Sequence, residues 1–358
     1  MTRKLASIRE IKEIRPIADA DAIELVIVDG WQVIAKKGEF SPGEKCIYFE
    51  IDSVLPIHPA FEFLRKSCYV KKDWIAAANP NNPTGEGFRL RTIKLRGEIS
   101  QGLVVPVLNF FNIDYDVGED VTELLNVIKW DPPVPAQLAG RAKGNFPAFI
   151  PKTDQERAQN MENRIFGKLL NEEFEVTLKL DGSSCTVYYN NGTSGVCSRN
   201  YDLDLGEENA DNSFIRAVRE SGVLDALKEY CEIHGRNLAI QSELMGPGVQ
   251  GNRENFSELC LYAFDVYDID RKTYLNDVER DDVIYDLRML CLNKLQFLRI
   301  PLVTYAKPAF FESLDHMLAF ASGWSINNRV REGLVWKSCN DPNISFKTIS
   351  NEFLLKEE

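Results

Sequence analysis

One lysine stands where a lysine is unusual, at the end of a strongly strand-like run. The run 174–178 (FEVTL) is rich in apolar and β-branched residues, and Lys179-Leu180-Asp181-Gly182 follows it, where the glycine indicates a tight turn. Packing at a strand end removes water from an amine, which can lower its pKa and make it a nucleophile. A surface lysine beside a hairpin is the plainer interpretation of this stretch alone, so the rest of the chain must decide.

Composition excludes several classes of protein. The 358 residues are enough for two domains, and no apolar run approaches the length of a membrane span. The N-terminus lacks the apolar segment of a secretory signal, and the eight cysteines form no C-x-x-C pair, so we expect reduced thiols and a cytoplasmic or other reducing intracellular location. With only three histidines, a histidine-based metal site or catalytic triad is not expected. The net charge of −12 argues against a nonspecific nucleic-acid coat protein.

Short strands separated by turn signals predict a small β-barrel in the first 130 residues. Strands are expected at 5–14, 23–28, 31–35, 45–51 and 102–107, with a helix within 55–68. Four basic residues precede the last of these strands: Arg89, Arg91, Lys94 and Arg96. The first two, and likewise the last two, are two positions apart, so in a strand the members of each pair would share a face. An OB-like barrel with a basic face commonly binds nucleic acid, so these four residues are candidates to contact it. The alternative is that they only form a solvent-exposed face of the sheet.

A proline-rich stretch marks the boundary of a second domain. Residues 131–154 are expected to form a linker, and Thr153 with Glu156 resembles a capping box for a helix over 154–169. Further helices are expected within 212–235, 276–295 and 311–327. Strands are expected around 174–178, 185–189, 195–200, 238–244, 261–267, 333–337 and 344–349.

Five charged residues stand in or beside these strands: Lys179, Arg199, Glu243, Glu332 and Lys347. An unpaired charge is costly next to an apolar run. Each one alone could be a strand-edge charge or half of a structural ion pair. Five in one domain indicate a shared polyanionic ligand together with a metal ion.

The surrounding motifs follow one another in a fixed order. They are Lys179-Leu180-Asp181-Gly182, Ser198-Arg199-Asn200, Glu243-Leu244-Met245-Gly246, Tyr262-Ala263-Phe264-Asp265, Glu332-Gly333-Leu334-Val335 and Ser345-Phe346-Lys347. This set resembles the covalent nucleotidyltransferases, which are the polynucleotide ligases and the RNA capping enzymes. The resemblance implies an α+β protein: an OB-like nucleic-acid-binding barrel over 1–130, the linker 131–154, and an adenylyltransferase domain of antiparallel sheets with helices over 155–358.

The order of the domains narrows the resemblance to one branch. Only 11 residues follow Lys347, too few for the C-terminal OB domain that DNA ligases and capping enzymes usually carry. The N-terminal barrel and the stretch Phe146 to Asp154 look like the ATP-dependent RNA ligases with an N-terminal OB module. One departure is Ser345, where the family often has a lysine two residues before the last one. Lys337 or Lys356 are candidates to compensate.

The resemblance also implies a mechanism. The Lys179 amine attacks ATP to give lysyl-AMP, AMP passes to an RNA 5′-phosphate, and an RNA 3′-OH then seals the strand, with nicks in a duplex the expected substrate. Lys347 would act with Lys179 in catalysis, and Glu332 and Asp181 would hold Mg²⁺ or Mn²⁺. The nucleotide would be bound by Asp181, Gly182, Arg199, Glu243 (to the ribose), Phe264 (stacked on adenine) and Lys337. Core packing is the alternative for Phe264. We expect a monomer.

Three other functions remain open. The first is another enzyme of the same superfamily, a capping guanylyltransferase or a DNA ligase. The second is a nucleic-acid-binding protein whose nucleotide pocket is inactive. The third is a structural OB protein with coincidental motifs.

Overall fold

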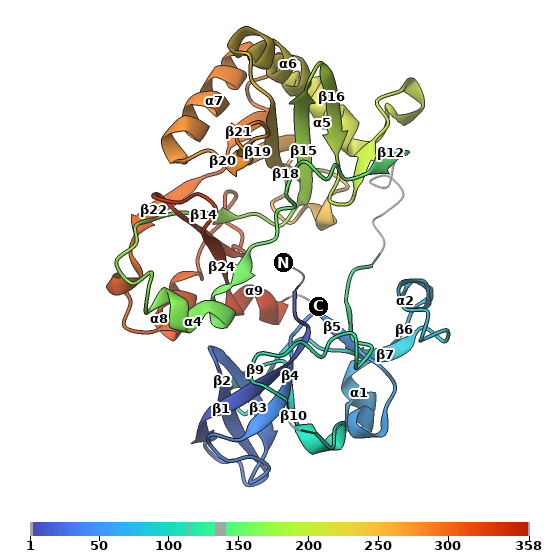
Figure 1. Cartoon of the computed structure of the whole chain (residues 1–358), viewed down its shortest axis with the longest axis vertical. Helices are drawn as coiled ribbons and strands as arrows, with labels where there is room; N and C mark the ends of the chain where they lie inside the picture. Colours follow the sequence, from blue (N-terminus) through green and yellow to red (C-terminus); the bar gives the residue numbers. More distant parts are fainter. Residues whose placement is uncertain (1–2, 114, 133–140, 357–358) are drawn as a thin grey trace. The chain divides into compact units, whose positions relative to one another are not determined.

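The computed structural model describes residues 3–113, 115–132 and 141–356 (Figure 1). The chain forms two compact units. Unit 1 comprises Met1–Pro133, Ala158–Asn163 and Leu354–Glu358, and unit 2 comprises Val134–Arg157 and Arg164–Phe353. The limits of the OB-like domain, linker and catalytic domain stay a prediction, although two short segments expected in the catalytic domain pack with unit 1.

Unit 1 is built on a five-stranded sheet in the order β10-β4-β1-β2-β3. A bulge between Ile11 and Glu13 lets one long strand pair with β4 through its first half and with β2 through its second. Asp29-Gly30 forms the predicted turn between β2 and β3. The strands are β1 (Ala6–Pro16), β2 (Ile23–Val28), β3 (Trp31–Lys36), β4 (Lys45–Phe49) and β10 (Leu103–Pro106).

A second sheet of unit 1 has the order β11-β5-β7-β6, and a separate hairpin joins β8 to β9. Phe49, Phe61 and Phe88 belong to one buried cluster that the two sheets share with the predicted helical segment. The elements are β5 (Ser53–Leu55), η1 (Pro59–Leu64), α1 (Arg65–Cys68), β6 (Tyr69–Lys71), α2 (Asp73–Ala78), β7 (Glu86–Arg89), β8 (Thr92–Leu95), β9 (Glu98–Gln101), η2 (Val107–Asn109) and β11 (Ile128–Lys129).

The four basic residues of this region do not lie on one strand, so the predicted shared faces are wrong. Arg89 ends β7, and its guanidinium lies 4.3 Å from the ring centre of Trp130. Arg91 lies between strands, Lys94 lies in β8, and Arg96 lies in the following turn with φ of 51°. The spacing of two misled because a strand ends within each pair, after Arg89 in the first and after Leu95 in the second. RNA contact by the exposed members of the group stays a prediction.

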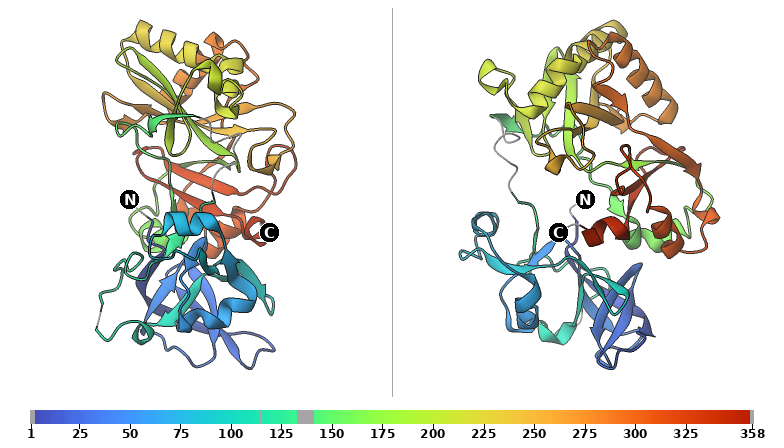
Figure 2. Two further views of the ribbon diagram at one scale, coloured as in Figure 1. Left: turned by 90° about the vertical axis from the view of Figure 1, so that its right-hand side faces the viewer. Right: turned by 180° about the vertical axis from the view of Figure 1, so that it is seen from behind.

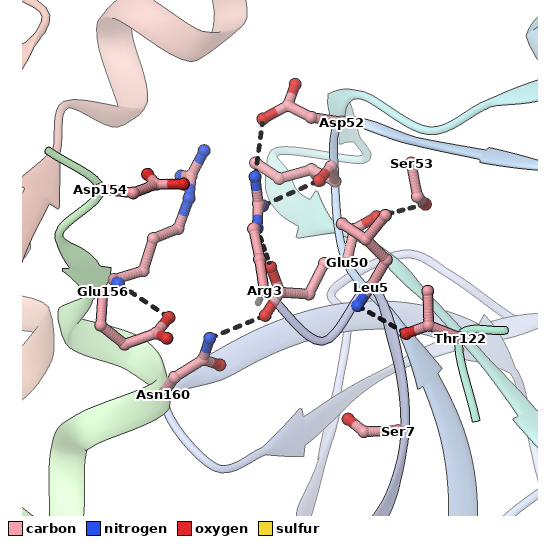
Figure 3. Close-up of polar contacts among 12 residues, drawn as sticks. Arg3, Leu5, Ser7, Glu50, Asp52, Ser53, Thr122, Asp154, Glu156 and Asn160 are labelled. Atoms are coloured by element: carbon pink, nitrogen blue, oxygen red, sulfur yellow. Dashed lines mark hydrogen bonds and ion pairs between the residues drawn. The ribbon is translucent and has the colours of Figure 1, made fainter. Parts of the chain in front are cut away.

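A buried carboxylate organises part of unit 1 (Figure 3). Glu50, only 1% exposed, accepts from Arg3 at 2.5 Å and from Asn160 at 2.7 Å. Asn160 in turn accepts from the indole nitrogen of Trp31 at 2.7 Å. A buried charge requires such partners. This hydrogen bonding holds the short η3 helix (Ala158–Met161) on the barrel of unit 1.

The helix predicted over 154–169 is wrong. Residues Glu156–Arg157 form β13, which pairs in parallel with β24, and only short turns follow, η3 and α4 (Glu162–Ile165). The side chain of Glu156 accepts from the amide of Arg157, and residues 153–157 are not helical. Pairing with a distant strand therefore outweighs the local capping signal.

Unit 2 contains two sheets. The larger has the order β12-β17-β16-β15-β18-β19-β20 with β21 beside β19, and the smaller has the order β13-β24-β23-β14-β22. The strands are β12 (Ala142–Asn145), β14 (Phe174–Lys179), β15 (Ser183–Asn190), β16 (Thr193–Cys197), β17 (Tyr201–Leu203), β18 (Leu238–Met245), β19 (Cys260–Asp268), β20 (Thr273–Tyr274), β21 (Phe297–Arg299), β22 (Leu302–Ala306), β23 (Gly333–Ser338) and β24 (Ser345–Ile349).

Three helices cover one face of the larger sheet (Figures 1 and 2). Their apolar side chains share one buried cluster with β15, β18 and β19. The helices are α5 (Ser213–Ser221), α6 (Val223–His234) and α7 (Asp277–Leu290). The predicted helix over 311–327 is shorter, α8 (Leu314–Phe320), and the last described element is α9 (Asn351–Lys356). Shorter η helices are Glu207–Asn209, Gln250–Asn252 and Pro308–Phe310.

The cysteines are free thiols, as the sequence indicates, and six of the eight are buried. In the described part of the chain, no group of three His, Cys, Asp or Glu side chains is placed to hold a metal ion. Among the described helices, none is long and apolar enough to cross a membrane.

Candidate active site

The candidate site begins on β14, whose residues alternate between two faces of the smaller sheet. Phe174 faces the apolar core with Trp336 and Phe346, whose rings are stacked 5.6 Å apart. Lys179 lies on the opposite face, at the strand end, because side chains alternate along a strand. Its amine donates to the carboxylate of Glu332 at 2.7 Å. Lys179 pairs across the sheet with Gly333, the residue after Glu332, so the two charged residues lie close together.

The turn after Lys179 brings the larger sheet to the same place. The amide of Gly182 donates to the carboxylate of Glu243 on β18 at 3.0 Å. A Cβ at position 182 would lie 2.4 Å from the carbonyl oxygen of Leu244, so only glycine fits. Asp181, in the same turn, pairs with Arg253 at 3.0 Å. Lys179, Asp181, Glu243 and Glu332, singled out separately from the sequence, thus form one cluster.

The charges of this cluster act on each other. Burial favours the neutral amine of Lys179, but the carboxylates of Glu332, Glu243 and Asp181 outweigh burial and hold its pKa above the usual value. The lowered pKa predicted from the strand end is therefore wrong for the chain alone. Burial raises the pKa of Glu243 to about 8, although Lys179 opposes this shift. The cluster thus carries less negative charge at neutral pH than three ionised carboxylates would give.

Two further cations meet around one carboxylate. The amine of Lys347, on β24, lies 3.4 Å from Asp154, and the guanidinium of Arg199 lies 3.6 Å from the other oxygen of Asp154. Both cations were singled out from the sequence, whereas Asp154 was assigned to a helix start. Arg253, the partner of Asp181, was also missed. No local pattern identifies either residue, because their partners lie far away in the sequence.

Phe264 occupies an irregular position on β19. The pairing of β18 with β19 shifts there, so that Gln241 faces Asp265 and Ser242 faces Ala263, which leaves Phe264 as the extra residue of a β-bulge. Bulges re-aim side chains and are frequent beside active sites. Phe264 is half-buried, so its ring is not enclosed in the core.

Lys337, on β23, reaches this bulge instead of the Lys179 cluster. Its amine donates to the carbonyl oxygen of Phe264 at 3.1 Å and forms an ion pair with Asp265. Lys337 is 7% exposed and Asp265 is 3% exposed. Burial lowers the pKa of Lys337, and Asp265 opposes the shift. The ammonium is therefore fully engaged within the protein, which does not favour the predicted direct contact with the nucleotide.

The fold and the motifs match known proteins. A model of an OB-fold domain matches residues 5–107, and the RNA ligase family model matches residues 172–350, which is half of the chain. The structure of Naegleria gruberi RNA ligase with PPi is 40% identical, each chain covers 99% of the other, and the TM-score is 0.89. A variant of that ligase with ATP and Mn is 39% identical, with 99% of both chains covered and a TM-score of 0.88. No curated protein matches the chain. The predicted fold, an N-terminal OB module followed by an α+β nucleotidyltransferase domain, is confirmed.

Proposed function

Because the chain belongs to the RNA ligase family, we propose that it joins RNA 3′-OH and 5′-phosphate ends in three steps driven by ATP. The observation that carries the proposal is the cluster of Lys179, Asp181, Glu243 and Glu332, which unites a strand-end amine with three carboxylates. The Naegleria ligase structures with ATP and Mn support the choice of nucleotide and of a divalent cation.

In the first step the Lys179 nitrogen attacks the α-phosphorus of ATP. A P–N bond forms, the bond from phosphorus to the pyrophosphate oxygen breaks with its electrons leaving on pyrophosphate, and the proton of the amine passes to solvent. Since Lys179 is ion-paired with Glu332, this contact must open before the amine can attack. Glu332 and Asp181 offer the carboxylate oxygens that Mg²⁺ and Mn²⁺ prefer. A cation there would supply charge neutralisation and release the amine from its carboxylate partner.

The remaining residues bind the nucleotide. Phosphoryl transfer depends chiefly on positioning and on neutralising phosphate charge. Lys347 and Arg199 supply the positive charge once they leave Asp154 and bind phosphate. The ion pairs with Asp154 are long and Asp154 is exposed, which favours this exchange. Glu243 binds the ribose. Phe264 stacks on adenine, presented by its bulge.

The later steps act on RNA. The RNA 5′-phosphate oxygen attacks the phosphorus of lysyl-AMP, which frees the lysine and forms an adenylylated strand. The 3′-OH then attacks the RNA 5′-phosphorus, forming the phosphodiester bond and releasing AMP. The preferred substrate in this proposal is a nicked duplex that brings the two ends together, which lowers the entropic cost of the last step.

The test is incubation with α-labelled ATP, a divalent cation and a nicked RNA duplex carrying a 5′-phosphate. Protein–AMP, adenylylated RNA and sealed RNA are followed separately. Lys179→Ala should abolish all three, whereas the control Lys228→Ala, at an exposed lysine of α6, should retain them. Label on the Lys179→Ala protein would refute the assignment of the nucleophile.

The same assay separates the alternatives. Covalent label from GTP in preference to ATP would indicate a capping enzyme, and sealing of DNA but not RNA nicks would indicate a DNA ligase. Binding of RNA without any covalent label would indicate an inactive nucleotide pocket.

A further inference from the structure

Trp324 differs from the other tryptophans of the chain in its exposure. All five tryptophans lie within the described residues, and Trp324 alone among them is exposed, at 68%. Trp31 and Trp336 are buried, and the other two are half-buried. Tryptophan is highly buried on average in folded proteins, so a fully presented indole points to a ligand.

The loop that carries Trp324 is rigid. The buried guanidinium of Arg331 binds the carbonyl oxygens of Ala321 at 2.9 Å and Ser322 at 2.8 Å, and also that of Phe320. Trp324 forms a β-bridge with Val330 across the loop. Inside this bridge the amide of Ser325 donates to the carbonyl of Arg329 at 2.7 Å. The backbone that carries Trp324 is therefore held in place, and binding a partner would cost little backbone ordering entropy.

The same loop leads directly into the candidate active site. Val330, bridged to Trp324, lies two residues before Glu332, a chain reach of about 7 Å at most. The side chain of Asn327 donates to the carbonyl of Glu254 at 2.8 Å. The residue before Glu254 is Arg253, which pairs with Asp181. The loops 250–256 and 323–331 thus form one connected rim, fixed to both Asp181 and Glu332.

We infer that Trp324 stacks on a nucleobase of the RNA beside the ends being joined. This inference rests on the proposed function, which places the RNA ends at Lys179 and hence near this rim. Stacking on an aromatic ring tolerates any base, because every base has a π-face, which suits an enzyme that must act at many sequences. Arg329, exposed on the same loop, provides a positive charge for the backbone of that RNA.

The experiment measures the affinity of the full-length protein for a 5′-phosphorylated nicked RNA duplex, with Lys179→Met in every protein so that no turnover occurs. Base–aromatic stacking is worth about 1–3 kcal/mol. Trp324→Ala should therefore weaken binding about 5- to 150-fold, and Trp324→Phe by less. The control Phe310→Ala removes another exposed aromatic of unit 2, 66% exposed, and should leave binding unchanged.

A second measurement assigns the contact to a base. Abasic nucleotides are placed one at a time at the four positions on each side of the nick. At one position the abasic nucleotide should weaken binding to the protein that retains Trp324 by about the factor that Trp324→Ala causes. The same abasic nucleotide should not change binding to the Trp324→Ala protein. The inference would be overturned if, at every position, the losses of affinity from the abasic nucleotide and from Trp324→Ala simply added, because no base would then interact with Trp324.

The rate of protein–AMP formation, measured with Lys179 intact, distinguishes this inference from the proposed function. Trp324→Ala should form protein–AMP at the rate of the unchanged protein, since the first step involves no RNA. Unchanged RNA affinity in Trp324→Ala refutes the stacking role while the ligase proposal stands. Absence of protein–AMP in the unchanged protein refutes the ligase proposal itself.

Discussion

Replacing Lys337 by methionine removes two contacts at once, the ion pair with Asp265 and the hydrogen bond to the backbone of Phe264. The Lys337–Asp265 pair is almost fully buried, at 7% and 3% exposure. Removing one partner of a buried ion pair leaves an uncompensated charge and costs about 3–5 kcal/mol. Lys337→Met should therefore lower the free energy of unfolding by this amount. For a domain of this size the expected fall in Tm is about 6–20 °C.

The double change Lys337→Met with Asp265→Leu tests the cause of that loss. Apolar replacement of a whole buried pair is often neutral or stabilising, so the double variant should regain most of the lost stability. It should not regain ATP binding, because the carbonyl of the bulged Phe264 still lacks the donor that Lys337 supplied. We expect a raised KM for ATP in protein–AMP formation, with the maximal rate much less affected.

The assays are calorimetric unfolding and the ATP dependence of covalent labelling. An unchanged Tm in Lys337→Met would show that the buried pair contributes nothing. Full recovery of both Tm and KM in the double variant would show that Lys337 does not position Phe264. A loss of maximal rate at unchanged KM would instead place Lys337 on the reacting phosphates.

Three smaller perturbations test other parts of unit 2. Asp154→Asn should lower the KM for ATP about 1.4- to 5-fold in the labelling assay, since exposed ion pairs are worth about 0.2–1 kcal/mol and this carboxylate competes with phosphate. A raised KM would contradict the exchange. Glu175→Gln should lower the Tm, because it removes the carboxylate at 2.7 Å from the buried guanidinium of Arg280 and leaves Asp281, at 3.2 Å, as its ion-pair partner. The fall should be smaller than the roughly 6–20 °C expected when a buried charge loses every partner. Thermal unfolding measures it, and an unchanged Tm would refute it. Burial raises the pKa of the Asp268 carboxyl, but Arg236 helps to outweigh burial and to hold this pKa below its usual value. The ionised carboxylate therefore stabilises the folded protein above about pH 3.9. This stabilisation is lost as the pH falls through the lower pKa of the folded state. Arg236→Gln should reduce this loss in urea unfolding between pH 5 and 3, and an identical pH profile in the two proteins would exclude the contribution.

The sequence predicted best the parts of the molecule that depend on local patterns. The apolar, β-branched run over 174–178 placed Lys179 correctly at the end of β14, because these residue types favour strands through local packing. The helix at 154–169 was wrong because parallel pairing of β13 with β24 is a long-range interaction. The bulge at Phe264 leaves no signal in a single sequence, since it arises from how two strands align. Asp154 and Arg253 went unrecognised for the same reason.

The register of the smaller sheet decides what Ser345 means for the site. Ser345 lies directly opposite Lys337, and Lys347 opposite Val335, so all four side chains share the face of Lys179. The positive charge of Lys337 is nevertheless directed to Asp265 and neutralised there. Lys337 is therefore not placed to replace a lysine at 345. In the proposed function the phosphate charge of ATP falls to Lys347 and to Arg199, which lies between β16 and β17 of the larger sheet. The proposal thus takes its two cations from different parts of unit 2 and needs no second lysine on β24.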